Sequence, residues 1–352
     1  MQYLAGFADK LIKWYDLNKR DLPWRHTNDP YKIWISEIIM QQTRVQQGLP
    51  YYENFTKTFP NVKDLADASL DQVLRLWQGL GYYSRARNMH EAAKEVTYNL
   101  NERFPGSFVD LIKLKGVGRY TAAAIASFAF GEKVPVVDGN VMRVISRVFG
   151  IEEDISLPPV IKKIENIAKD HISNQYPGIF NQAIMEFGAL YCIPGKPDCE
   201  NCIFRDSCFA FNNNMVFKLP LKINKVKVKQ RYFNYILFKH GSLTALKQRT
   251  KKDIWMGLHE YYLIETEKLP EPHELREILI PVINEPILFE EISEIHVHIL
   301  THQKIYARFY TCITTNKNEI ENLGFKFYSD VEIEELAKPV LILKNIKREF
   351  FL

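Results

Sequence analysis

The chain has 352 residues, of which 46% are hydrophobic and 25% charged, and its formal net charge is +4. This composition is that of an ordinary folded protein of about two domains, and the mild charge does not by itself indicate a nucleic-acid partner. No apolar stretch approaches the length of a membrane span, and residues 1–20 lack the pattern of a signal peptide. We therefore expect a cytoplasmic protein without membrane contact, whose five cysteines do not form disulfides.

The first 210 residues have an almost entirely helical pattern. A central helix is predicted at Ile33–Val45, after Asn28 or Asp29 as the cap and Pro30 in the first turn. Apolar residues within it recur at helical spacing and predict a buried stripe. The other predicted helices of this half lie at about 1–20, 49–59, 69–78, 84–99, 141–149, 159–173 and 180–190, and 111–130 is predicted as two helices joined by a turn at 116–118.

Glu37 stands on another face of the central helix, beside apolar residues and one turn before Gln41. An apolar setting favours the neutral form of a carboxyl group, which a general acid needs near neutral pH. A surface glutamate next to a core stripe is the alternative that this window leaves open.

The second half changes to aromatic and β-branched residues with period-two alternation, which predicts strands. Two helical stretches lie between them, so this half is predicted to be α+β. A polar, basic linker at 211–229 is expected to separate domains at 1–210 and 230–352. The predicted strands are 231–238, 259–264, 287–301 and 303–313, and the predicted helices are 272–279 and 331–338.

Four cysteines fall close together, at Cys192, Cys199, Cys202 and Cys208. In a reducing compartment such a group indicates a metal centre. The spacing does not fit a paired C-x-x-C zinc ribbon, and a compact set of four suits an iron–sulfur cluster. Zinc remains the structural alternative.

Two glycine turns could meet a phosphate or a base. Gly116 and Gly118 lie between two predicted helices, where backbone amides can hold a phosphate, although a plain tight turn has the same pattern. The turn at 79–82 ends in Tyr82, an aromatic residue that could enter a base stack. A helix turn covered by core tyrosines is the alternative there.

Asp138 follows an apolar extended run and precedes a predicted helix, which is the position of an N-cap. The helix N-terminus is expected to favour its ionised form. Glu37 and Asp138 would then form a pair with divided acid and anion roles, a combination suited to cleaving a bond between a sugar and a heteroatom. Most aspartates at such positions are only caps.

Taken together, these residues resemble the MutY family of adenine DNA glycosylases, in the helix-hairpin-helix superfamily that includes endonuclease III. The resemblance implies a mainly α glycosylase domain with an iron–sulfur loop at 192–208, followed by an α+β, Nudix-like domain. The motifs that carry it, besides the cysteines, are L-P-W-R at Leu22–Arg25, S-E-I-I-M-Q-Q-T at Ser36–Thr43, G-L-G-Y-Y-S-R-A-R-N at Gly79–Asn88, K-G-V-G-R-Y-T at Lys115–Thr121 and V-D-G-N-V at Val137–Val141.

The resemblance implies a monomeric enzyme that removes adenine mispaired with 8-oxoguanine, or with guanine, from double-stranded DNA. By the family pattern Glu37 protonates the adenine, and Asp138 stabilises the sugar cation or adds to it covalently, with support from Tyr120 and Asn140. The further roles that it implies are a base pocket near Arg20, Leu22, Trp24 and Arg25, insertion of Gln42 and Tyr82 into the base stack, phosphate binding by Gly116 and Gly118, and a 4Fe–4S cluster on Cys192, Cys199, Cys202 and Cys208.

Position 120 also bears on the reaction type. Bifunctional endonuclease III relatives carry a lysine there, and Tyr120 cannot form an imine, so a monofunctional glycosylase is expected. In the second half, Leu300-Thr301-His302 aligns with the family's F-S-H loop, which implies that Thr301 and His302 read 8-oxoguanine. The glutamate-rich Nudix box is absent, so no pyrophosphohydrolase activity is expected.

Two other functions are weighed against this one. A thymine-mismatch glycosylase of the same superfamily shares the cysteines and a tyrosine in the hairpin, but Glu37 and the additional C-terminal domain favour adenine. A non-catalytic iron–sulfur DNA-binding protein is the second alternative. It would tolerate the loss of Glu37, and the presence of both carboxylates offers it no support.

Overall fold

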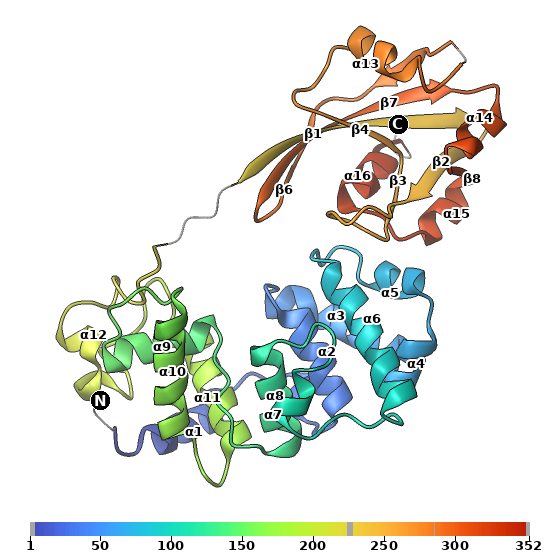
Figure 1. Cartoon of the computed structure of the whole chain (residues 1–352). Coiled ribbons are helices and arrows are strands. Elements are labelled where there is room, and N and C mark those ends of the chain that lie inside the picture. The colour runs from blue at the N-terminus through green and yellow to red at the C-terminus, as the bar shows by residue number, and fades with distance from the viewer. Residues whose placement is uncertain (1–3, 224–227, 285, 350–352) are drawn as a thin grey trace. The chain divides into compact units, whose positions relative to one another are not determined.

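The computed structural model describes residues 4–223, 228–284 and 286–349 (Figure 1). The chain forms two compact units, one of residues 1–67 and 88–224 and the other of residues 68–87 and 225–352. The segment 68–87, which the sequence pattern assigned to the first domain, thus groups with the second half of the chain.

Unit 1 is helical, as predicted. The described residues of this unit contain no strand, and the apolar run 134–137 is irregular. The elements are α1 (Phe7–Asn18), η1 (Pro23–Arg25), α2 (Pro30–Met40), α3 (Val45–Thr58), α4 (Val62–Asp67), α6 (Ser84–Lys94, its start counted with unit 2), the π-helical turn η2 (Glu95–Asn99), α7 (Phe108–Leu111), α8 (Arg119–Phe130), α9 (Gly139–Phe149), α10 (Pro158–His171), α11 (Pro177–Leu190), η3 (Arg205–Ser207) and α12 (Phe209–Asn212).

Helix α2 begins as the sequence predicts but ends early. The Asp29 side chain caps it by accepting a hydrogen bond from the Tyr31 backbone N–H at 2.9 Å, and Pro30 occupies the first turn. The helix stops at Met40, and Gln42 adopts a left-handed φ of 57°. The expectation that the helix continues to Val45 was therefore wrong, because the chain turns at 41–44 before α3 begins.

The core of unit 1 joins α1, α9, α10 and α11 with the cysteine loop. It also includes Val216 and Leu219, and the Arg147 guanidinium donates a hydrogen bond to the Leu219 carbonyl at 3.0 Å. The first part of the predicted linker 211–229 therefore packs against unit 1, because its apolar residues complete the core. Residues 224–227 of that linker lie outside the described part of the chain.

Unit 2 is built on a mixed sheet, which confirms the α+β prediction. The strand order is β3-β2-β1-β7-β5, while β4 pairs with β1, β6 with β7 and β8 with β2. β1 and β7 run parallel and the other described pairs are antiparallel. The strands are β1 (Lys229–His240), β2 (Leu243–Gln248), β3 (His259–Glu260), β4 (Tyr262–Thr266), β5 (Phe289–Ile292), β6 (His296–Ile299), β7 (Gln303–Ile313) and β8 (Lys326–Tyr328).

Helices cover this sheet, and one of them closes a core of its own. Leu275 and Leu279 of α13 pack on Ile236 and Tyr310 of the central strands. Cys312 is buried in the same cluster, as expected for an isolated cysteine in a strand. The helices of unit 2 are α5 (Leu70–Leu76), α13 (Pro272–Leu279), α14 (Lys317–Asn322), α15 (Asp330–Glu335) and α16 (Val340–Glu349). Over the described residues, no helix has the length and apolar character needed to span a membrane.

Candidate active site

Glu37 lies on α2 and is buried, with 7% of its surface exposed. The Tyr120 hydroxyl of α8 donates a hydrogen bond to its Oε2 at 2.6 Å. The pKa of Glu37 is raised to about 7, mainly by burial and further by the nearby Asp138. The hydrogen bond from Tyr120 and the charge of Arg25 act in the opposite direction and lower this pKa. A carboxyl group in this setting can hold and release a proton near neutral pH.

Asp138 caps α9, as its sequence position predicts. Its Oδ1 accepts from the Val141 backbone N–H at 2.8 Å, and its Oδ2 accepts from the Asn140 side-chain amide at 2.8 Å. Burial nevertheless raises the pKa of Asp138 above its ordinary value, and the donors at the helix start lower it only in part. The donors at the helix start therefore favour the ionised form, as expected, and desolvation is a second influence that acts in the opposite direction.

An open groove of about 790 Å³ brings several predicted residues together. Its wall includes Gln42, Tyr120, Asp138 and Asn140, together with the hairpin glycines Gly116 and Gly118. These residues come from the turn after α2, the start of α8 and the start of α9. The groove is therefore a surface on which a polymer could lie against Asp138 and Tyr120, while Glu37 lines a separate, smaller cavity.

The hairpin glycines have different reasons for being glycine. Gly116 has a φ of 75°, and a Cβ there would come within 2.5 Å of the Asn88 Cβ, so a side chain is excluded. Gly118 precedes α8, and a Cβ there would have no neighbour within 4 Å. The backbone at the start of α8 is therefore open to a partner, and helix N-termini favour anions.

Gln42 and Tyr82, the two residues predicted to enter the base stack, share a backbone feature. Gln42 has a φ of 57° and Tyr82 a φ of 47°, values that side chains other than glycine rarely adopt. Both side chains are exposed, Tyr82 by 43%. Such strained, exposed residues are concentrated at functional sites.

The predicted base-pocket residues are only partly brought together. Trp24 and Arg25 line a small cavity of about 50 Å³ with Glu37 and Gln182. Leu22 is buried but is not among the residues lining this cavity, and Arg20 is directed to Glu186.

Glu186 of α11 is a residue that sequence reasoning missed. Its carboxylate, 1% exposed, accepts hydrogen bonds from Arg20 at 2.9 and 2.6 Å and from Arg25 at 2.9 and 2.7 Å. Burial alone would raise the pKa of Glu186, but the two guanidinium groups lower it to about 2. A single charged residue inside the otherwise uncharged stretch 180–190 was the available signal.

Comparison with known proteins places this geometry in a family. Residues 35–170 match the HhH-GPD superfamily of base excision DNA repair proteins. The adenine DNA glycosylase of Buchnera aphidicola from Schizaphis graminum is 37% identical over 253 residues, which cover 72% of this chain and 73% of that relative. The chain belongs to the adenine DNA glycosylase family.

Other relatives extend the match. The adenine DNA glycosylase of Arabidopsis thaliana is 33% identical and covers 84% of this chain and 56% of its own length. The human enzyme of that name is 43% identical over 216 residues, covering 59% of this chain and 40% of its own length. As a family member, the chain is a DNA N-glycosylase of base excision repair.

Solved structures agree with the helical fold. A thermostable thymine-DNA glycosylase matches with a TM-score of 0.55 and 30% identity, over 59% of this chain and 95% of that one. Endonuclease III trapped on DNA matches with a TM-score of 0.51 and 21% identity, also over 59% of this chain and 95% of its own, and supports the fold alone.

The cysteine loop of this glycosylase packs against the core of unit 1. Burial is the main reason that the pKa of Cys202 is raised to about 12, and the neighbouring sulfur atoms of Cys192, Cys208 and Cys199 contribute to the rise. Arg147 donates to the Cys192 Sγ and the Phe204 backbone N–H to the Cys202 Sγ, both at 3.4 Å. Four gathered thiols with N–H donors aimed at sulfur fit an iron–sulfur cluster.

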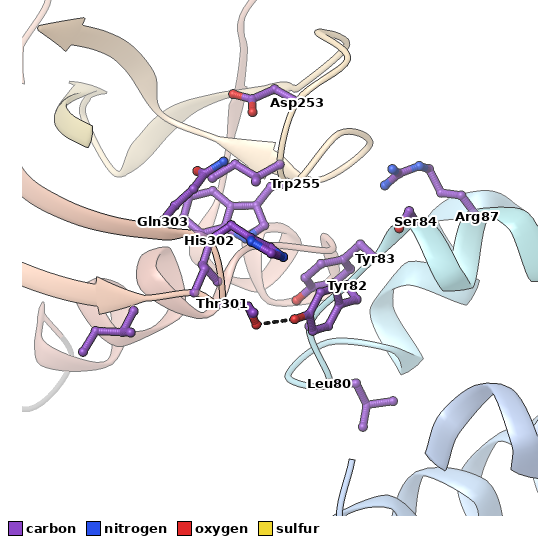
Figure 2. Close-up of a pocket in the computed structure, with 14 residues that line it drawn as sticks. Leu80, Tyr82, Tyr83, Ser84, Arg87, Asp253, Trp255, Thr301, His302 and Gln303 are labelled. Atoms are coloured by element: carbon purple, nitrogen blue, oxygen red, sulfur yellow. Dashed lines mark hydrogen bonds between the residues drawn. The ribbon is translucent and has the colours of Figure 1, made fainter. Parts of the chain in front are cut away.

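The predicted lesion-reading residues lie in unit 2, in the turn between β6 and β7 (Figure 2). Thr301 and His302 are exposed and line a cavity of about 420 Å³ together with Tyr82, Trp255 and Asp253. The Tyr82 hydroxyl and Thr301 Oγ1 form a hydrogen bond, drawn as a dashed line. Two residues far apart in sequence, each predicted to meet the mispair, are thus joined directly.

The wall of this cavity is fixed by hydrogen bonds between segments that are distant in sequence. The Arg87 guanidinium donates to the Met256 carbonyl at 2.7 Å, which ties the start of α6 to the loop before β3. In that loop Asp253 accepts from Arg231 at 2.7 and 3.0 Å and from Arg249 at 2.7 Å. The cavity wall is therefore a braced loop carrying the Trp255 ring.

Proposed function

We propose that this glycosylase removes adenine mispaired with 8-oxoguanine, or with guanine, from double-stranded DNA, and that it hydrolyses the N-glycosidic bond without cutting the strand. The observation that carries the proposal is the buried Glu37, whose pKa of about 7 keeps a proton available beside a second carboxyl group. Membership in the adenine DNA glycosylase family supports it.

The mechanism follows from the two carboxyl groups. Glu37 protonates the departing adenine, so the bond between the base and C1′ breaks with the electron pair leaving on a neutral base. The sugar becomes an oxocarbenium ion, which the Asp138 carboxylate faces and stabilises. Water then adds at C1′, and its released proton returns to a carboxylate, which leaves an abasic site.

Two neighbours keep these groups in place. The Tyr120 hydroxyl donates a hydrogen bond to Glu37 Oε2, so the other carboxyl oxygen is left to carry the reactive proton. Asn140 holds Asp138 through its side-chain amide, while its own Oδ1 accepts from Arg143 at 2.9 Å. Because position 120 is a tyrosine, no imine with the sugar can form, which supports a monofunctional enzyme.

The decisive experiment is a glycosylase assay on duplexes containing adenine opposite 8-oxoguanine, followed by alkali to reveal abasic sites. The wild-type protein is expected to release adenine, and Glu37→Gln to be nearly inactive. Glu53→Gln is the matched control, because Glu53 is an exposed glutamate on the neighbouring helix α3. Equal cleavage by wild type and Glu37→Gln would reject Glu37 as the acid.

A thymine:guanine duplex in the same assay tests the second candidate. The likeness to a thymine-DNA glycosylase at 30% identity gives this alternative its support. Release of thymine in preference to adenine would replace the proposed substrate.

For the cysteine loop we propose a 4Fe–4S cluster on Cys192, Cys199, Cys202 and Cys208, which supports the fold of the loop and supplies no step of hydrolysis. Purified protein should be yellow-brown and contain four iron and four sulfide ions per chain, as such a cluster requires. A colourless preparation containing zinc would contradict the proposal.

A further inference from the structure

Two consecutive residues of α8 hold the end of α2 at two points. The Tyr120 hydroxyl donates to Glu37 Oε2 at 2.6 Å, and the Gln41 side-chain amide donates to Thr121 Oγ1 at 2.9 Å. Thr121 is 1% exposed, so its hydroxyl meets Gln41 in a buried setting. Glu37 and Gln41 are four positions apart, which is about one helical turn.

The second contact stands directly before a strained residue. Gln41 is the C-cap of α2, and Gln42 follows with its left-handed φ of 57°. The Thr43 backbone N–H donates to the Met40 carbonyl at 3.2 Å and closes the turn around Gln42. The Gln41–Thr121 hydrogen bond therefore fixes the near end of the segment that presents Gln42 to the groove.

We propose that Gln41, acting through Thr121, is a positioning residue that couples the insertion of Gln42 into DNA to the placement of Glu37 against the base. This rests on the proposed function, in which Gln42 enters the base stack and Glu37 is the acid. The physical basis is that Glu37 lies in the last turn of α2 and Gln41 is the C-cap that follows it, while Tyr120 and Thr121 are consecutive residues in the first turn of α8. A shift of the turn that carries Gln42 moves Gln41, and the Gln41–Thr121 hydrogen bond transmits this movement to α8. The hydrogen bond from Tyr120 of α8 then transmits it to Glu37.

The test uses the full-length protein and a duplex with adenine opposite 8-oxoguanine. A 2-aminopurine next to the mispair reports insertion by its fluorescence, because unstacking brightens it. Thr121→Val removes the hydroxyl at nearly constant shape, Gln41→Met removes the amide at a less buried position, and Thr121→Ser retains the hydroxyl as the conservative variant. For each protein the dissociation constant, the fluorescence change and the single-turnover cleavage rate are measured.

Thr121→Val and Gln41→Met are each expected to slow cleavage roughly tenfold, the effect of one neutral hydrogen bond, with little change in the dissociation constant. Both should reduce the fluorescence change, and Thr121→Ser should restore both signals. The double variant should be no slower than either single one, because the two side chains share one contact. A merely structural role would weaken binding or folding without this pattern.

The proposal is overturned if both variants, folded by circular dichroism, insert and cleave like wild type, or if their effects simply add. Should Thr121→Val fail to fold, Gln41→Met alone decides: wild-type insertion and cleavage in this variant overturn the proposal, and a joint reduction of both supports it. Failure of the proposed function is a separate outcome. If wild type cleaves no adenine, the fluorescence change in Gln41→Met still reports whether Gln41 controls insertion.

Discussion

Unit 1 contains two buried glutamates whose surroundings differ in one respect. Glu186 meets two guanidinium groups, and its pKa falls to about 2. Glu37 meets a single neutral hydroxyl, that of Tyr120, and its pKa rises to about 7. Arg25 lies near both, but of the two glutamates it donates hydrogen bonds to Glu186. The comparison teaches that the partner of a buried carboxyl group, rather than burial itself, decides whether the group is a fixed anion or a proton donor.

The largest effect is expected when the proton donor is removed. Glu37→Gln keeps the shape of the side chain but cannot supply a proton, so the single-turnover rate on adenine opposite 8-oxoguanine should fall about a thousandfold. Binding to the same duplex should change little. Retention of more than a tenth of the wild-type rate would mean that another group protonates the base.

Substitution of Glu186 should act mainly on the stability of the fold. Glu186→Gln leaves Arg20 and Arg25 without their carboxylate, so the free energy of unfolding should drop by about 3 kcal/mol. Urea unfolding at pH 7 measures it. A variant as stable as wild type would show that the two guanidinium groups are well solvated without Glu186, and the contrast between the two sites would then be smaller than the geometry suggests.

The pH dependence of the free energy of unfolding should reveal the raised pKa of Glu37. The pKa of Glu37 is higher in the folded chain than in the unfolded one, where it is near 4.5, so its neutral form is favoured by folding. Stability should therefore fall as pH rises from about 4.5 to about 7, by roughly 3 kcal/mol in total for this group. Unfolding of Glu37→Gln, followed over the same range, should lack this fall. Parallel curves for the two proteins would count against a raised pKa.

Tyr120→Phe sharpens the comparison with a smaller effect. The hydroxyl lowers the pKa of Glu37, so its removal should raise that pKa further. Activity needs the protonated acid and is lost as pH rises through its pKa, near 7 in wild type. The alkaline limb of the rate profile should move to higher pH in Tyr120→Phe, with a roughly tenfold lower rate for the lost hydrogen bond. A limb that stays in place would separate Tyr120 from the proton.

The smallest effect is expected in unit 2. Thr301→Val removes the hydroxyl that meets Tyr82, and should lower the preference for 8-oxoguanine over guanine opposite adenine by roughly fivefold, as one exposed hydrogen bond allows. Thr301→Ser, which keeps the hydroxyl, is the control. Competition assays with the two duplexes measure the ratio, and an unchanged ratio in Thr301→Val would show that this hydroxyl does not read the lesion.

Local signals in the sequence predicted much of the fold. Asp29 and Pro30 predicted the start of α2, Asp138 the start of α9, and the bounds of α13 and β7 were predicted residue for residue. Capping residues and strand alternation act over a few positions, so they can be read without a partner. The motif around Glu37 likewise led to a residue that is buried beside Tyr120.

Other features depend on contacts between distant segments, and local patterns do not show them. Glu186 is recognisable as an anchor only once Arg20 and Arg25 meet it across 166 and 161 positions, respectively. The pKa of Asp138 depends on how much protein surrounds it, which the cap position did not reveal. Strands β2 and β8 were missed because they are short and complete a sheet whose pairing is not local.

The grouping of residues 68–87 with the second unit has a practical consequence for anyone who shortens this protein. Leu74 and Trp77 are fully buried there, the Gln248 side chain donates to Asp71 at 3.0 Å, and the Lys338 backbone N–H donates to Gln78 at 2.9 Å. A fragment that stops near residue 217 would keep that segment but strip away its cover. Loss of lesion preference in such a fragment could then result from the newly exposed apolar surface. Substitutions at Thr301 leave that surface covered and therefore test lesion recognition more directly.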